Sequence, residues 1–137
     1  MKVDVRWTGK MSFLGISGSG HAVVMDTSQA NGGEGSAPSP MEMVLMGLAG
    51  CSGIDVVSIL EKKRVPFKGL QILIDGERAE EHPRVFTKVK MTFVFKGKDL
   101  NQKALEDSIR LSLDKYCSVA GMVSKTAEIS WEIAVED

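Results

Sequence analysis

The sequence is poor in cysteine, and no two of its cysteines and histidines are closely spaced. Its 137 residues include two cysteines, Cys51 and Cys117, and two histidines, His21 and His82. These four side chains could in principle bind zinc, but zinc sites usually contain a pair such as Cys-x-x-Cys. We therefore expect no metal and no other cofactor.

The sequence also lacks a run of basic residues and any interleaving of basic with aromatic residues. Its net charge is −1, and charges of both signs alternate along the chain. Because a nucleic-acid-binding groove needs concentrated positive charge, we expect no nucleic-acid partner. Residues 1–6 lack the apolar core of a signal peptide, which predicts a cytoplasmic protein. In that reducing compartment, two cysteines are more often free, catalytic or redox-sensing than joined in a structural disulfide.

The most informative segment begins at Ser39 and predicts a long helix from Pro40 to about residue 64. Ser39 and Glu42 have the spacing of a capping box, in which each side chain bonds to the backbone amide of the other residue. Proline suits the first helical position because its φ is already helical. The predicted helix carries Cys51 on an almost wholly apolar surface.

This helix is apolar enough to raise the alternative of a membrane span. Asp55 is the one charged residue between residues 43 and 60. A membrane-spanning helix needs at least about 17 consecutive, predominantly apolar residues. A helix that is apolar nearly all round is equally typical of a buried core, and the predicted strands need such a helix as cover. We expect a core helix and no membrane partner.

The remaining apolar patterns predict an α+β fold in a single domain, residues 1–137. Alternating apolar residues predict strands, and spacing of three to four residues predicts a second helix whose apolar face includes Leu105, Ile109, Leu113 and Tyr116. Residues 27–39 are rich in turn formers and predict a loop. The expected order is βββ-α-ββ-α-β in mostly antiparallel sheets, with strands near 3–7, 11–16, 21–25, 70–74, 89–95 and 129–135, and helices near 40–64 and 101–116.

Three glycines recur every three residues around Cys51 in the long helix: Gly47, Gly50 and Gly53. Each costs about 1 kcal/mol relative to alanine in a helix interior. Such a run permits the close approach of another backbone. Tight packing within one chain is one explanation, but we favour a homodimer in which this helix crosses its own copy near Cys51.

Taken together, these features resemble the OsmC/Ohr superfamily, named for osmotically induced protein C and organic hydroperoxide resistance protein. The similarity lies in the order of elements, the Pro-x-Glu helix start before a helix cysteine, and the sequences WTG at 7–9, PRVFT at 83–87 and KYCSV at 115–119. The resemblance implies an intertwined homodimer with two long central helices. It also implies a subunit-interface site where paired cysteines reduce organic hydroperoxides and are regenerated by a dithiol reductant.

By the same resemblance, Cys51 corresponds to the peroxide-attacking cysteine and Cys117 to its resolving partner. In the family's peroxidases, an arginine held by a glutamate of the cysteine helix activates the attacking thiol. Glu42 stands one residue later than that glutamate, and the loop before the helix contains no arginine. Glu42 and Arg6 are nevertheless the nearest candidates for supporting residues.

Other residues could also support the cysteines. Asp55 lies one helical turn after Cys51 and could orient a substrate or water, or pair with a cation. Lys10 and Arg84 are further possible sources of positive charge.

Two functions follow from these observations. The first is thiol-dependent reduction of organic hydroperoxides by Cys51 and Cys117, a form of peroxide defence. The second is a non-peroxidatic dimer of the same fold that binds a small apolar ligand or acts as a thiol redox sensor. The cysteine pair favours the first function, and the displaced glutamate with no nearby arginine favours the second.

Overall fold

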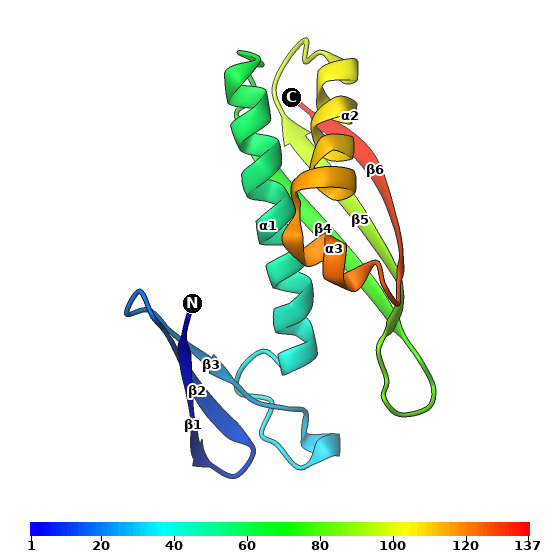
Figure 1. Ribbon diagram of the computed structural model, residues 1–137. Helices are drawn as coiled ribbons and strands as arrows, with labels where there is room; N and C mark the ends of the chain where they lie inside the picture. The colour runs from blue at the N-terminus through cyan, green and yellow to red at the C-terminus, as the bar shows by residue number, and fades with distance from the viewer. The chain divides into compact units, whose positions relative to one another are not determined.

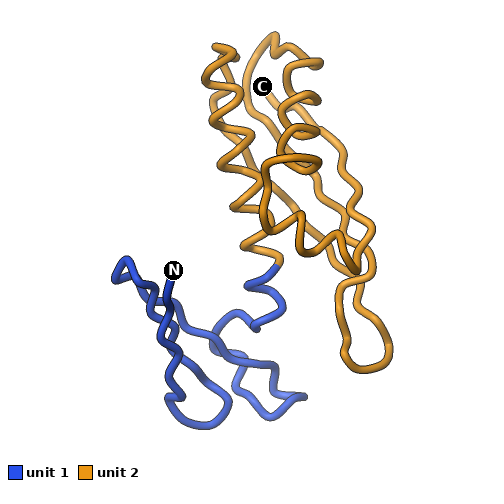
Figure 2. Tube along the Cα trace, viewed as in Figure 1, with its two compact units in different colours: residues 1–44 blue, residues 45–137 orange.

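The computed structural model describes residues 1–137, which form two compact units, Met1–Val44 and Leu45–Asp137 (Figure 2). Helix α1 (Pro40–Lys62) begins in the first unit and continues through the second. Both cysteines lie in the second unit.

The first unit contains a three-stranded antiparallel meander, followed by a loop. The strands are β1 (Val3–Gly9), β2 (Ser12–Ser17) and β3 (Ala22–Met25), paired in that order. The predicted loop contains the short 3-10 turn η1 (Gln29–Asn31) and is tied to the buried carboxylate of Asp26. That carboxylate accepts bonds from the Ser36 hydroxyl and from the amides of Thr27, Ser36 and Glu34, and the Ser36 hydroxyl is the largest cause that lowers the pKa of Asp26 to about 2.

The second unit is a three-stranded sheet with helices on one face (Figure 1). Its strands are β4 (Gly69–Arg78), β5 (Phe86–Lys96) and β6 (Glu128–Glu136). Strand β5 is central, and it carries four buried apolar side chains at alternate positions: Val89, Met91, Phe93 and Phe95. Strand β6 pairs with β5 in parallel, whereas every other strand pair in the chain is antiparallel. The α+β class and the predicted order of strands are confirmed.

The second predicted helix is divided into three elements. They are α2 (Gln102–Leu111), the π-helical turn η2 (Ser112–Tyr116) and α3 (Ser118–Val123). Leu105 and Ile109 are buried as predicted, and Ser112 on the same face is also buried, but Tyr116 is exposed. The wider turn changes the rotation of the chain, so the prediction that Tyr116 faces inward is wrong.

Helix α1 starts with the predicted capping box. Glu42 Oε1 accepts from the Ser39 amide at 3.0 Å, and Ser39 Oγ accepts from the Glu42 amide at 3.2 Å. Four residues at intervals of four turn inward and are fully buried: Leu48, Ser52, Val56 and Leu60. By length and hydropathy, α1 could also cross a membrane, but core helices pass the same test. Only 22% of its most apolar window is buried, so a single chain leaves much of this apolar helix uncovered.

Candidate functional site

Cys51 and Cys117 reach the same place from distant parts of the sequence. Cys51 lies in the middle of α1, next to the inward-facing Ser52, and is half-buried. Cys117 lies where the π-helical turn η2 ends and α3 begins, and its side chain is 4% exposed. Both thiols are free, and the Cys51 thiol lies close enough to Cys117 to interact with it.

The position of Cys117 is defined by two backbone hydrogen bonds. Its amide donates to the Ser112 carbonyl at 2.7 Å, which closes the π-helical turn. Its Sγ accepts from the Ala120 amide at 3.3 Å, so Cys117 is the N-cap of α3. A sulfur in that position is held at the start of a helix and cannot swing away without breaking the cap.

The environment of Cys117 favours its neutral form. Burial raises the pKa of the Cys117 thiol from 9.0 to about 11, while the Ala120 amide acts in the opposite direction and the neighbouring Cys51 thiol adds to the increase. Desolvation penalises a thiolate because the charged sulfur loses its hydration. At neutral pH Cys117 is therefore a thiol, which suits a group that acts second, after another sulfur has been oxidised.

This raised pKa predicts a loss of stability at alkaline pH. Between pH 9 and 11 the unfolded chain releases the Cys117 proton and the folded chain keeps it, so folding stability falls as the pH rises. The slope is at most about 1.4 kcal/mol per pH unit for one proton. Urea unfolding of reduced protein at pH 7.5, 8.5 and 9.5 would measure it. The variant Cys117→Ser should have a shallower slope over the last interval, and equal slopes would contradict the pKa assignment.

A buried polar cluster lies beside the two cysteines. The Ser112 hydroxyl donates to Asp55 Oδ2 at 2.9 Å and lies 3.0 Å from Ser52 Oγ. Both serines are completely buried, and Asp55 is half-buried. The cluster connects α1 to the π-helical turn η2 within the apolar core. Asp55 was predicted from the sequence as a candidate, whereas Ser52 and Ser112 were not. The signal for Ser112 is its position on the same helical face as Leu105 and Ile109.

The other predicted supporting residues bond to local partners. Glu42 is engaged in the capping box, and donation from the Ser39 amide lowers the pKa of its carboxyl. Arg6 is exposed on β1 and pairs with Asp4 at 2.8 Å. Both residues belong to the first unit. Of the sequence candidates, the structure thus brings together Cys51, Cys117 and Asp55.

The remaining candidate cations are also engaged locally. Lys10 pairs with Glu34, and Arg84 donates to the Ala79 carbonyl at 3.3 Å. No lysine or arginine side chain donates a hydrogen bond to the sulfur of Cys51 or Cys117 in the structure. The family's arginine therefore has no counterpart among these bonds.

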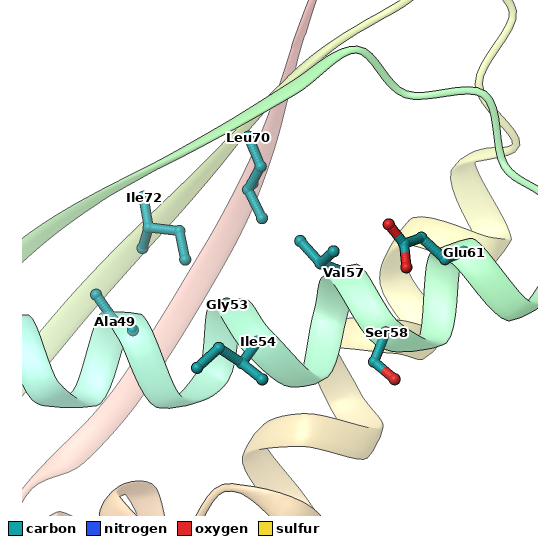
Figure 3. A pocket seen from close by; sticks show the side chains of 9 residues that line it. Ala49, Gly53, Ile54, Val57, Ser58, Glu61, Leu70 and Ile72 are labelled. Atoms are coloured by element: carbon teal, nitrogen blue, oxygen red, sulfur yellow. The ribbon is translucent and has the colours of Figure 1, made fainter. Parts of the chain in front are cut away.

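An apolar groove lies on the surface between α1 and β4 (Figure 3). Leu70 and Ile72 of β4 point toward the face of α1 that carries Ala49, Gly53 and Val57. The groove is about 650 Å³ in volume.

The three glycines of α1 differ in what surrounds them. A Cβ on Gly53 would meet the Ile72 Cδ1 atom at 3.2 Å, so this glycine permits close packing of α1 on β4. Gly47 and Gly50 have nothing within 4 Å of the corresponding position. Packing within this chain explains one glycine and leaves the other two facing open space.

Comparison with known proteins places this site in a family context. The family model described as OsmC-like protein matches residues 33–132. Protein YhfA of Escherichia coli K12 is 46% identical over 130 residues, which cover 95% of this chain and 94% of YhfA. The crystal structure of a hypothetical protein from Aquifex aeolicus VF5 is 35% identical, with a TM-score of 0.82 over 99% of this chain and 97% of the other. An organic hydroperoxide resistance protein from Legionella pneumophila shares the fold, with a TM-score of 0.72 at 12% identity over 98% and 96%.

Proposed function

The chain belongs to the OsmC-like protein family, and we propose that its Cys51 and Cys117 form a redox pair that reduces organic hydroperoxides. The observation that carries this proposal is the proximity of two free thiols, one half-buried and one buried, from distant parts of the sequence. The structural likeness to hydroperoxide resistance proteins gives further support. We place this peroxide defence in the cytoplasm, where the thiols stay reduced between turnovers.

The reaction has two steps. The Cys51 thiolate attacks the distal oxygen of the hydroperoxide, and the O–O bond breaks. The sulfur becomes a sulfenic acid, and the alkoxide takes a proton from water and leaves as the alcohol. The Cys117 thiol then attacks that sulfur. A disulfide forms, and the departing hydroxide takes the Cys117 proton and leaves as water. An external dithiol reductant returns both cysteines to thiols.

The functional unit is proposed to be a homodimer in which α1 packs against a second copy of this chain. Ile54 is 73% exposed beside the apolar groove, and Gly47 and Gly50 leave open space on the helix. An uncovered apolar helix surface of this kind is typical of an interface between subunits. The similarity to YhfA extends over 130 residues and so includes parts of both compact units, which supports treating residues 1–137 as one OsmC-like domain.

A second candidate function is binding of a small apolar ligand, or redox sensing, without peroxidase turnover. The observation that favours it is the bonding of Glu42, Arg6, Lys10 and Arg84 to local partners. The first step needs a thiolate, and no lysine or arginine hydrogen-bonds to either cysteine sulfur in the structure.

Reaction of the reduced protein with one equivalent of cumene hydroperoxide tests the two functions. Intact mass and non-reducing peptide mapping would follow the product, with hydrogen peroxide as the comparison oxidant. We expect a Cys51–Cys117 disulfide to form quickly, and faster with the organic hydroperoxide because the surroundings of the thiols are apolar. Oxidation no faster than that of free cysteine would refute the peroxidase function and leave ligand binding or redox sensing.

A further inference from the structure

Ser112 is bonded both to α1 and to the segment that carries Cys117. Its hydroxyl donates to Asp55 at 2.9 Å and lies 3.0 Å from the Ser52 hydroxyl, one residue beyond Cys51 on α1. Its carbonyl accepts from the Cys117 amide at 2.7 Å. Ser112 therefore connects the helix of one cysteine to the backbone of the other, through hydrogen bonds at its hydroxyl and at its carbonyl.

The π-helical turn η2 makes this arrangement possible. Turns of this type are rare and frequently occur at functional sites. Ser112, at the start of the turn, is buried on the same helical face as Leu105 and Ile109, whereas Tyr116, at its end, is 54% exposed. The same turn ends at Cys117, which then caps α3. Helical spacing thus brings the Ser112 hydroxyl to Asp55, and the π-helical turn brings the Cys117 amide to the Ser112 carbonyl.

Stability alone gives little reason for such a cluster. Burying polar groups in an apolar core is costly, and hydrogen bonds return only part of the cost. Their benefit is geometric, because a bond to a carboxylate has a narrow range of distance and direction. Apolar residues at these positions would fill space but would allow the two cysteine segments to shift relative to each other.

We propose that Asp55 and Ser112 are positioning residues that hold the Cys117 thiol opposite Cys51 and so favour the disulfide between them. This inference rests on the proposed redox pairing of the cysteines, but not on a hydroperoxide as the oxidant. Any oxidant that yields the disulfide is subject to the same geometry. The two residues act through the protein backbone.

The test measures the disulfide equilibrium of the full-length protein in mixtures of reduced and oxidised glutathione. In this reaction, two protein thiols and one oxidised glutathione give the protein disulfide and two reduced glutathiones, so electrons balance without a peroxide. Ser112→Ala should lower the equilibrium constant roughly tenfold because it removes the bond to a charged group. Alkylation of the remaining thiols and mass spectrometry would give the disulfide fraction.

Ser108→Ala is the matched control. Ser108 is also completely buried on the same helical segment, but its hydroxyl donates to the Leu105 carbonyl at 2.7 Å and is not bonded to the cluster. We expect this variant to change the equilibrium constant by less than about twofold, even where its unfolding midpoint falls as far as that of Ser112→Ala. Equal shifts in the two serine variants would overturn the proposal, because they would indicate a general loss of packing.

Asp55→Ala provides an independent variant that breaks the same bond. It should match Ser112→Ala, and the double variant should add little to either one, since the interaction is already lost. Additive effects would overturn the proposal, as would a wild-type protein that forms no disulfide at any glutathione ratio. A wild type that forms the disulfide with glutathione but does not react with cumene hydroperoxide would refute only the peroxidase function.

Discussion

The variant Cys51→Ser is expected to lose hydroperoxide reduction almost completely, by more than about a thousandfold, because it removes the proposed nucleophile. Cys117→Ser should behave differently. It keeps Cys51 and should complete the first step once, but its sulfenic acid has no partner thiol. Consumption of cumene hydroperoxide, followed in the presence of a dithiol reductant, would separate the two variants.

The products identify which step each cysteine performs. With excess hydroperoxide, Cys117→Ser should accumulate sulfinic and sulfonic acids on Cys51, because nothing condenses with the sulfenic acid before further oxidation. In Cys51→Ser, the buried Cys117 should stay reduced at neutral pH, since burial raises its pKa to about 11. Oxidation of Cys117 in place of Cys51 would contradict the assigned order and would make Cys117 the attacking sulfur.

Ile54→Asp is expected to dissociate the proposed homodimer. Ile54 is 73% exposed on α1 and borders the apolar groove, so a second copy of the chain would bury it. Burying an unpaired carboxylate in an apolar interface should raise the dissociation constant about a hundredfold or more. Sedimentation velocity over a range of protein concentrations would measure this change.

Leu73→Asp is the matched control for the interface. Leu73 is another exposed apolar residue, 52% accessible on β4, and does not line the groove. Its replacement by the same charged residue should leave the dissociation constant unchanged. Equal effects of the two substitutions, or a monomeric wild type, would contradict the assignment of this groove to the dimer interface.

Much of the secondary structure was predictable because it depends on interactions between residues close in sequence. The capping box requires only Ser39 and Glu42, and its two hydrogen bonds form as expected. The alternation along β5 likewise predicts its buried face. The second helix was less predictable, because its apolar spacing continues to Tyr116 while the backbone changes to a π-helical turn after Leu111.

By itself, the sequence determined the α+β class, the order of the strands and the position of the long helix. It also singled out Cys51 and Cys117 as the candidate site residues. Tertiary structure decided that β6 pairs in parallel with β5, that Tyr116 is exposed while Ser112 is buried, and that the two cysteines lie near each other. The physical reason is that these features depend on contacts between distant residues, such as the bond from Ser112 to Asp55, 57 positions away. The periodicity of apolar residues predicts which side of a helix or strand is buried. It cannot predict which distant residue packs against that side or where the backbone departs from regular helix.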